Sequence, residues 1–448
     1  MHVVVLGAGY AGLTLARELD DRLSDRDNLT VVDDTGTHLV QHELHRLIRR
    51  PGLADELELP LAALLDEDVS IRRERVDAID RNDRSIALAD GERLDYDLAA
   101  ISLGADADFH GLDGLAEHAT PLKRIEDARE IRVGVQPVLD ADGRIVVGGA
   151  GLSGIQVAGE LAEMRTDADS DASIVLLEQR DSVAPGFDPQ FQRAVRRQLE
   201  ARDVTVWTDA SVESADADAI EFARGEPMAY DELIWTGGIR GDDAMDQQRP
   251  VVRSDLRLDE RTFALGDAAR VVDDHGERVP ASARTAISQA RVVASNVEAI
   301  VEHHRAHGAG SFTPRLDRYT MGQPRWLVSV GDGAVAQIGQ AVLTGRAALA
   351  LKTSVGAGYV GRVGPIRNAV DLVWSELGLG GDDPSTMELP RRKTKLGDRD
   401  DAQGGPDDEL AAAERDDHSG ETGRAETDRA ETERAEKGQA EEGRTETD

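Results

Sequence analysis

The sequence predicts an α/β chain, because one strand–turn–helix pattern occurs in it twice. The first copy has the turn GAGYAG at residues 7–12, just after an apolar run at residues 3–6. The second has GAGLSG at residues 149–154, just after the apolar residues 145–147. Each turn has the spacing G-x-G-x-x-G between a buried-looking strand and a helical pattern, which predicts a Rossmann-like dinucleotide-binding domain. Two such domains in one chain point to electron transfer between two bound cofactors.

The elements around the first turn follow the order of a doubly wound sheet. Residues 2–6 are apolar enough for a buried strand, residues 11–23 carry apolar side chains at helical spacing, and residues 29–32 form the next apolar run. An Asp-Gly pair at residues 90–91 indicates a turn between two later strands. Further along we expect strands at residues 70–76, 85–88 and 98–103, and a connecting helix at residues 121–133.

A second unit repeats this order from residue 144. Its helix, residues 153–164, places Ile155, Ala158 and Leu161 on one face. The elements expected after it are strands at residues 174–177, 204–207, 233–236, 263–265 and 326–330, and helices at residues 190–201, 283–304 and within 341–377.

Composition narrows the class of protein. The 448 residues are enough for two or three domains. There is no apolar stretch near 18 residues, so we expect no ordinary transmembrane helix. A strand begins within three residues of Met1, which leaves no room for a signal peptide and favours a cytoplasmic location. The sequence has no cysteine, which excludes a redox disulfide and cysteine-ligated metal or iron–sulfur sites within it.

The charge is strongly acidic. The net charge is −35, and only five of the 52 basic residues are lysine. An acid-rich, lysine-poor surface is typical of proteins that work in very high salt, where the screening length falls to about 3 Å. An ordinary acidic protein is the alternative. The same charge disfavours binding to nucleic acid.

Each glycine of the first turn has a separate task. Gly7 permits a tight turn, Gly9 lets the backbone approach a pyrophosphate, and Gly12 allows the helix to pack closely on the strand. The start of the helix then presents free N–H groups to the phosphates. Asp33 ends the second strand, 21 residues after Gly12, where a carboxylate accepts hydrogen bonds from a ribose.

The second turn also has its acid. Glu178 ends the strand at residues 174–177, 24 residues after Gly154. A carboxylate there suits the free 2′-hydroxyl of NADH and repels the additional phosphate of NADPH. Arg180 keeps NADPH open as the less favoured cofactor.

The chain resembles the two-dinucleotide-binding flavoproteins and, within them, the type II NADH dehydrogenases (NADH:quinone oxidoreductases). Residues 96–104, 146–161, 230–238 and 263–267 carry this resemblance, which extends from residue 1 to about residue 380. It implies a glutathione-reductase-like fold, with FAD at the first turn, NADH at the second and a quinone as electron acceptor. NADH would pass a hydride to FAD, which would then give two electrons to the quinone.

The turns and the resemblance together imply two sets of binding residues. For FAD they are Gly7, Ala8, Gly9, Tyr10, Ala11, Gly12, Asp33, Val76, Gly104, Gly266, Asp267 and Ala283. For NADH they are Gly149, Gly151, Leu152, Ser153, Gly154, Glu178, Gly237 and Gly238.

The acceptor side departs from the family pattern. The family's A-Q-x-A-x-Q motif reads ARTAIS at residues 283–288, and Gln156 stands where the family has a glutamate. Gln156, Arg284 and Gln289 are therefore candidate acceptor-side residues rather than assigned catalytic groups. A soluble NAD(P)H flavin reductase or diaphorase, and a non-catalytic flavoprotein sensor, are the alternative functions.

Three histidines, at residues 38, 42 and 45, have the spacing of one helix face. A metal site or a proton relay is one reading, and a polar helix face near the flavin is the other. We expect no bound metal.

These observations predict a domain order. Residues 1–118 and 246–314 would form the FAD domain, and residues 119–245 the NADH domain. Residues 315–390 would form a C-terminal α+β segment that contacts the inner face of the cell membrane or makes a homodimer. Residues 391–448 begin with a basic cluster, and from residue 398 carry 19 acidic and seven basic residues, which predicts a disordered, solvating tail.

Overall fold

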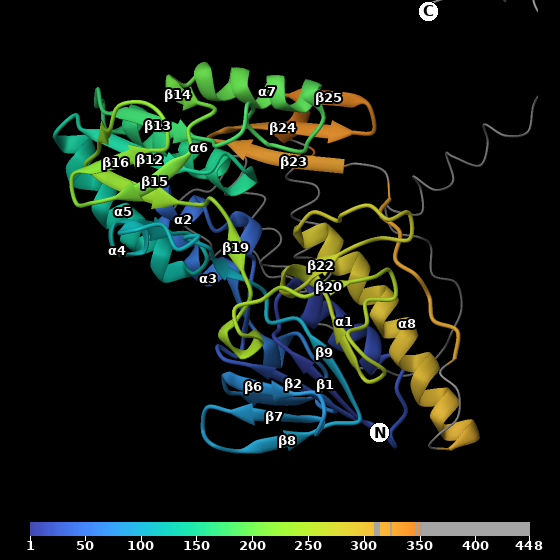
Figure 1. Ribbon diagram of the computed structural model, residues 1–448. Coiled ribbons are helices and arrows are strands. Elements are labelled where there is room, and N and C mark those ends of the chain that lie inside the picture. Colours follow the sequence, from blue (N-terminus) through green and yellow to red (C-terminus); the bar gives the residue numbers. More distant parts are fainter. Residues whose placement is uncertain (309–313, 323–324, 346, 350, 352–448) are drawn as a thin grey trace, which may run out of the picture. The chain divides into compact units, whose positions relative to one another are not determined.

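The computed structural model describes residues 1–308, 314–322, 325–345, 347–349 and 351. The chain separates into two units, Met1–Gly381 and Asp382–Asp448, and every described residue belongs to the first. This unit contains two five-stranded sheets, one in the lower part and one at the upper left of Figure 1. All neighbouring strands within each of them are parallel, which confirms the predicted fold class.

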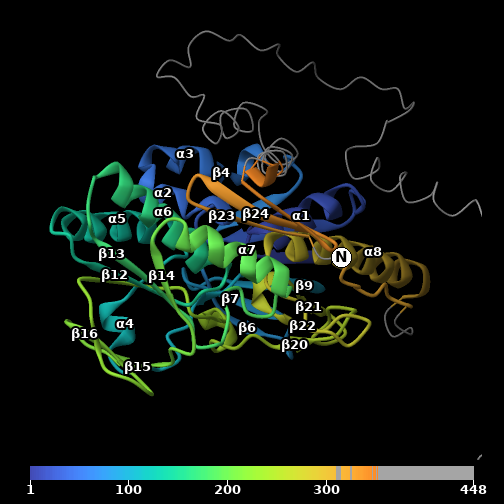
Figure 2. The same cartoon turned by 90° about the horizontal axis from the view of Figure 1, so that it is seen from above.

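The first sheet has the order β21-β9-β1-β2-β5. Its strands are β1 (His2–Leu6), β2 (Asn28–Asp33), β5 (Ser70–Arg73), β9 (Leu98–Ile101) and β21 (Thr262–Ala264). The side chains of Val3, Val4 and Val5 are fully buried, as expected of a parallel strand covered on both faces. Helices α1 (Tyr10–Asp20) and α8 (Ala283–His307) lie side by side against this sheet (Figures 1 and 2). An antiparallel sheet of β6 (Val76–Asp80), β7 (Ser85–Leu88) and β8 (Arg93–Asp95) completes this region.

The second sheet repeats this design with the order β11-β18-β12-β13-β14. Its strands are β11 (Thr120–Pro121), β12 (Arg144–Gly148), β13 (Ser173–Leu177), β14 (Val204–Trp207) and β18 (Glu232–Trp235). The helices that pack with it are α5 (Ile125–Asp140), α6 (Leu152–Asp167) and α7 (Pro189–Glu200). Val146, Val175 and Leu177 cluster instead with side chains of a small antiparallel sheet. That sheet consists of β15 (Val212–Ala215), β16 (Ala219–Phe222) and β17 (Met228–Ala229).

Shorter elements connect and flank the two sheets. The strand pairs are β3 (Thr37–Leu39) with β4 (Glu58–Pro60), β10 (Asp106–Ala107) with β19 (Ile239–Arg240), and β20 (Val251–Val252) with β22 (Arg270–Val271). The short helices are η1 (Gln41–Glu43), α2 (Arg46–Arg49), η2 (Pro51–Leu53), α3 (Ala54–Leu57), η3 (Leu61–Ala63), α4 (Leu115–His118), η4 (Asp243–Met245) and η5 (Gly266–Ala268). A final antiparallel sheet of β23 (Arg325–Val330), β24 (Gly333–Ile338) and β25 (Ala341–Thr344) packs on α6 and α7.

The structure corrects three of the expected elements. The connecting helix extends to Asp140 rather than ending at residue 133, and the strand expected at residues 70–76 is divided between β5 and β6. Residues 341–344, expected to be helical, form β25 because they pair with β24. Most of the remaining segment to residue 377, and all of residues 391–448, lie outside the described residues. Within the described part, no helix is both long enough and apolar enough to cross a membrane.

Candidate functional site: two nucleotide-binding turns

The outer glycines of both turns have conformations and surroundings that exclude a side chain. Gly7 has φ +87° and Gly149 has φ +94°, in the left-handed region that favours glycine. A Cβ on Gly12 would lie 1.8 Å from the carbonyl oxygen of Gly7. A Cβ on Gly154 would lie 1.9 Å from that of Gly149. The third glycine of each turn therefore lets its helix approach the turn closely.

The middle glycines face open space. A Cβ on Gly9 or on Gly151 would meet no atom within 4 Å. Each of them directly precedes its helix, α1 or α6, whose first N–H groups have no partner inside the helix. A cradle of this kind, formed by the first N–H groups of a helix and the positive end of its dipole, fits a pyrophosphate.

The two acids predicted to bind a ribose also contact the backbone of their turns. Asp33 Oδ2 accepts a hydrogen bond from the Ala8 N–H at 2.8 Å. In the same way, Glu178 Oε2 accepts one from the Ala150 N–H at 3.0 Å. The other oxygen of Glu178 accepts from the Arg180 N–H at 3.0 Å. Each carboxylate is thus fixed at the carboxyl end of its strand, beside the turn, where a ribose is bound in such domains.

Two hydroxyl side chains hold the turns and were missed by the sequence reasoning. Ser102, directly after β9, donates to the carbonyl oxygens of Leu6 and Gly7 at 2.8 and 3.0 Å. Thr236, directly after β18, donates to those of Gly148 and Gly149 at 3.0 and 2.9 Å. A hydroxyl residue at the end of the strand that neighbours the turn strand was the available signal.

The Ala8 and Ala150 carbonyl groups are held by different kinds of donor. The Ala8 oxygen accepts from His38 Nδ1 at 2.9 Å, and because a carbonyl only accepts, Nδ1 carries the proton. The Ala150 oxygen accepts from the backbone N–H of Ala184 at 2.8 Å. His38 is fully buried, and burial lowers its pKa from 6.5 to about 4, so its ring is neutral.

The Gly266-Asp267 segment returns the chain to the first turn. Gly266 has φ +64°, and a Cβ there would lie 3.0 Å from the Cβ of Ala11. Arg249 donates from Nε to the carbonyl oxygen of Asp267 at 2.6 Å. Burial lowers the pKa of the Lys123 ammonium, while the nearby Asp267 carboxylate acts in the opposite direction. The Asp267 carboxylate therefore lies near a partly buried cation at the edge of the first turn.

The remaining residues predicted for FAD lie around the same sheet. Val76 is buried at the start of β6, and Gly104 follows β9 with φ +78°. Ala283 is the first residue of α8. Tyr10 begins α1, and its hydroxyl forms a hydrogen bond with His42 Nδ1.

The predicted NADH residues lie together at the carboxyl edge of the second sheet. Leu152 and Ser153 begin α6, and Gly237 and Gly238 follow Thr236. The Gly237 carbonyl lies 3.1 Å from Nε2 of His110, a residue that the sequence reasoning did not single out.

The three acceptor-side candidates lie on two helices. Gln156, on α6, donates from Nε2 to the carbonyl oxygen of His42 at 3.4 Å. Arg284 and Gln289 are on α8, where Arg284 is exposed and Gln289 is buried. Gln289 Oε1 accepts a hydrogen bond from the Gly266 N–H at 2.8 Å. The structure thus places Gln289 against the Gly266 segment, beside the first turn.

The three histidines do not share a helix face, so that expectation was wrong. His38 lies in β3, His42 in η1, and His45 directly before α2. Pairing of β3 with β4 keeps residues 37–39 extended, which local spacing does not reveal. Among the described residues, no group of three or more His, Asp or Glu side chains is arranged to hold a metal ion.

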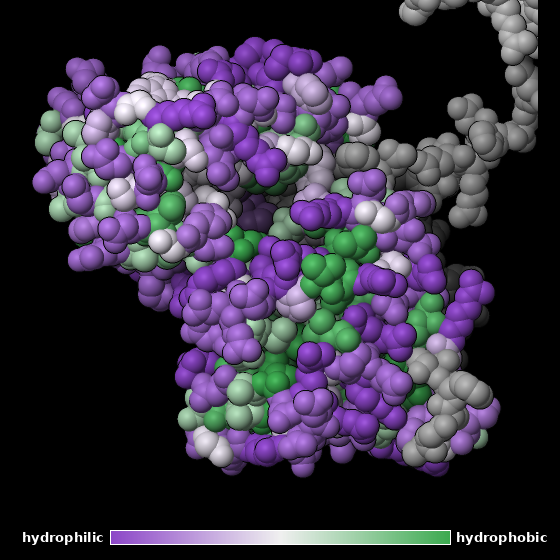
Figure 3. Space-filling model, viewed as in Figure 1, coloured by the Kyte–Doolittle hydropathy of each residue, from purple (hydrophilic) through white to green (hydrophobic). Residues whose placement is uncertain are grey.

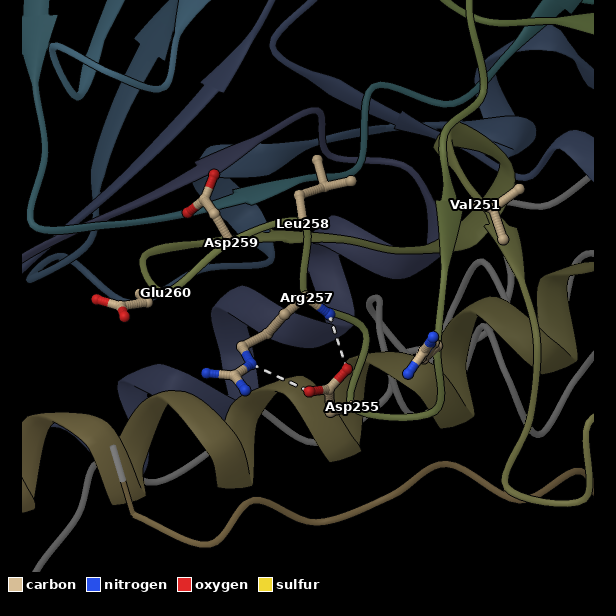
Figure 4. A pocket seen from close by; sticks show the side chains of 7 residues that line it. Val251, Asp255, Arg257, Leu258, Asp259 and Glu260 are labelled. Carbon is tan, nitrogen blue, oxygen red and sulfur yellow. Dashed lines mark hydrogen bonds and ion pairs between the residues drawn. The ribbon is translucent and has the colours of Figure 1, made fainter. Parts of the chain in front are cut away.

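A separate surface hollow lies away from both turns. Its lining residues all come from residues 251–260, and none belongs to either turn (Figure 4). Arg257 is paired with Asp255 there, through Nε at 3.1 Å, and Asp259 is paired with Arg81. The face shown in Figure 3 is mainly hydrophilic, and its apolar residues gather around β20 and β22 and below them. These mutually satisfied charges do not form a nucleotide site.

Comparison with known families agrees with this geometry. Residues 1–290 match the family described as pyridine nucleotide-disulphide oxidoreductase. The chain belongs to this family. The sequence contains no cysteine, so this member lacks the disulfide for which the family is named.

Within the pyridine nucleotide-disulphide oxidoreductases, individual relatives point to the NADH dehydrogenases. A protein of Staphylococcus haemolyticus named type II NADH:quinone oxidoreductase is 25% identical over 336 residues, covering 68% of this chain and 83% of that relative. A Bacillus subtilis NADH dehydrogenase-like protein, YutJ, is 24% identical over 278 residues, covering 60% of this chain and 76% of that relative. The resemblance inferred from the sequence is confirmed.

Solved structures support the fold. The structure of NDH2 from Plasmodium falciparum in complex with NADH has a TM-score of 0.71 at 14% identity, covering 84% of this chain and 97% of that one. The sulfide:quinone oxidoreductase of Aquifex aeolicus has a TM-score of 0.68 at 17% identity, covering 87% of this chain and all (100%) of that one.

Proposed function

We propose that the protein is an FAD-dependent NADH dehydrogenase that uses a quinone as electron acceptor. The observation that carries this proposal is the presence of two complete turns, each with its acid against the second residue of the turn. The Gly266 segment, which reaches Ala11 of the first turn, supports FAD there and NADH at the second. The names of the type II NADH:quinone oxidoreductase relatives support the activity and the acceptor.

In this function the chain's own residues bind and orient. When bound, FAD takes a hydride from NADH and then supplies two electrons to the acceptor. The N-termini of α1 and α6 would stabilise the two pyrophosphates. Asp33 and Glu178 would each hold a ribose, and Glu178 would favour NADH over NADPH. No side-chain nucleophile is needed, because the protein's main contribution is to position the nicotinamide ring against the flavin ring.

The absence of cysteine from the sequence separates this proposal from disulfide chemistry. A relay through a redox disulfide or an attacking thiolate requires cysteine sulfur. In the proposed function the chain itself therefore contributes no redox-active sulfur, and its residues serve to bind and orient the two cofactors. For the acceptor side we propose Gln156 and Arg284, whereas the bond from Gly266 to Gln289 supports a role for Gln289 in holding the FAD segment.

We also propose that residues 315–390 either bind the inner face of the cell membrane or form a homodimer interface. The need to reach a lipid-soluble quinone favours the membrane role. The net charge of −35 supports the proposal that the protein functions in high salt. Flotation with anionic vesicles, and light scattering in high and low salt, would separate these possibilities. No flotation and a monomeric mass would contradict both roles of the segment.

A two-stage anaerobic experiment tests the function. Purified protein should show a flavin absorption band that NADH bleaches. A menaquinone analogue added next should restore the band. A band that NADH leaves unchanged would contradict the dehydrogenase, and a band that NADH bleaches but the quinone does not restore would favour a soluble diaphorase.

A further inference from the structure

A partly exposed tryptophan is joined through its backbone to the acid of the second turn. Only 3% of this sequence is aromatic. Trp207 is the last residue of β14, and 44% of its surface is exposed. The ring is therefore accessible to a ligand that has a flat face to stack on it.

Backbone hydrogen bonds fix this position relative to Glu178. Trp207 is in register with Leu177 of β13, and the Glu178 N–H donates to the Trp207 carbonyl oxygen at 2.8 Å. Two residues later, the Asp209 N–H donates to the Arg180 carbonyl oxygen at 2.9 Å. The segment after β14 therefore runs beside the segment that carries the acid.

A second aromatic ring supports the indole from within. Phe222 of β16 is buried, and its ring centroid lies 6.1 Å from that of Trp207. The indole is therefore anchored against the small antiparallel sheet while much of its surface stays accessible. A held, partly exposed aromatic ring loses little freedom when a ligand stacks on it.

We propose that Trp207 is the platform on which the adenine ring of NADH stacks. This rests on the proposed function, in which Glu178 holds the adenosine ribose. Adenine is bonded directly to that ribose, so a ribose held at Glu178 places the base among the groups beside this acid. Two tryptophans end strands at this edge of the sheet, Trp207 of β14 and Trp235 of β18. Trp235 is buried, whereas Trp207 is accessible and is held beside Glu178 by the β13–β14 pairing.

Stacking of a base on an aromatic ring changes affinity by about tenfold or more when the ring is removed. The test uses the FAD-loaded full chain as wild type, Trp207→Ala and Trp207→Phe. Calorimetry gives the Kd of ADP-ribose, which has the adenosine but no nicotinamide. We expect Trp207→Ala to raise this Kd by about tenfold and Trp207→Phe to restore most of the affinity.

Steady-state rates provide a second readout. The KM for NADH should rise in Trp207→Ala with kcat nearly unchanged, whereas the KM for reduced nicotinamide mononucleotide, which lacks adenine, should stay the same. Val133→Ala is the matched control, because Val133 is an apolar side chain that is 72% exposed on α5. Its parameters should equal those of the wild type.

The outcomes separate the two proposals. Equal ADP-ribose affinity in wild type and Trp207→Ala would overturn the stacking role and leave the dehydrogenase intact. A wild type that binds no ADP-ribose would instead contradict the nucleotide assignment of the second turn. A rise in KM for reduced nicotinamide mononucleotide equal to that for NADH would show a general distortion and would also overturn the stacking role.

Discussion

The first and second turns share a backbone design but differ in what holds them. Both place an acid on the N–H of the second turn residue, and both fix the turn carbonyl with a hydroxyl, Ser102 or Thr236. The difference concerns the donor to the carbonyl oxygen of that second residue. Ala8 is held by a titratable side chain, His38, whereas Ala150 is held by a backbone N–H.

This difference suits the two roles proposed for the turns. The first turn is also approached by the Gly266 segment, which Gln289 fixes through the Gly266 N–H. Contacts from three separate parts of the chain thus converge on the site proposed for FAD, as expected for a cofactor that stays bound. The second turn, beside which Trp207 is partly exposed, suits a cofactor that must bind and leave at every cycle.

The largest expected effect is the loss of FAD binding when one methyl group is added to the first turn. In Gly12→Ala the new Cβ would lie 1.8 Å from the Gly7 oxygen, so α1 must move away from the turn. We expect FAD affinity to fall by more than about a hundredfold, equal to about 3 kcal/mol. The FAD content of the purified protein, read from its absorption spectrum, checks this.

Gly52→Ala is the matched control, because a Cβ on Gly52 would meet no atom within 4 Å. It should keep a full complement of FAD. A yellow Gly12→Ala protein with normal FAD affinity would show that the first turn is not the FAD site.

A smaller effect is expected from acidification, and only at the first turn. The pKa of folded His38 is lowered from 6.5 to about 4, so the unfolded chain takes up the proton first as the pH falls. Stability is therefore lost as the pH falls from 6.5 toward 4, by up to about 3 kcal/mol. FAD release against pH measures this effect.

His38→Asn keeps a donor for Ala8 but cannot titrate in this range. FAD release from this variant should depend less on pH than release from the wild type. The affinity for ADP-ribose should change with pH to the same extent in the variant and in the wild type. The same pH dependence in wild type and His38→Asn would refute the role of His38.

Removing one of the two turn-holding hydroxyls should weaken the affinity for one cofactor only, by an intermediate amount. Ser102→Ala and Thr236→Ala each remove a side chain that donates to two consecutive carbonyl groups. The cost of such a loss is about 1 kcal/mol, or about fivefold in affinity. Ser102→Ala should weaken FAD and Thr236→Ala should weaken ADP-ribose, with Thr236→Ser as the conservative control. If both variants weakened the same ligand, the comparison of the turns would be wrong.

The smallest effect concerns a charge far from either turn. Glu232 begins β18, at the end of the strand opposite to Thr236, and burial together with the Glu130 charge raises its pKa from 4.5 to about 7. Stability is then lost as the pH rises from 4.5 through 7, because the unfolded chain ionises first. Since the side chain is partly exposed, Glu232→Gln should stabilise the protein above that range by less than about 1 kcal/mol. Thermal melts at both ends of the range measure this, and equal gains at both would contradict it.

The sequence was sufficient for the parts of the fold that depend on local pattern. Both strand–turn–helix units, their acids and the strand before Gly266 were predicted, since each has its own periodicity or spacing. The two turns were predictable because glycine is needed there for reasons of backbone conformation and contact.

Features that depend on distant pairing were not predictable. β25 was expected to be helical, and the pattern at His38, His42 and His45 was misleading, because β24 and β4 supply partners that local spacing does not show. The extension of α5 was hidden by Pro137 inside the helix. Ser102 and Thr236 were missed because a hydroxyl after a strand becomes a signal only when that strand is known to neighbour the turn strand.

The assignment of FAD to the first turn and NADH to the second is the central claim, and Gly154→Ala tests it directly. Its new Cβ would lie 1.9 Å from the Gly149 oxygen and would displace α6 from the second turn only. The flavin band of this variant should be present and should be bleached by dithionite, but not by an NADH concentration that bleaches the wild type. Bleaching by NADH at the wild-type rate, or a protein purified without FAD, would contradict the assignment.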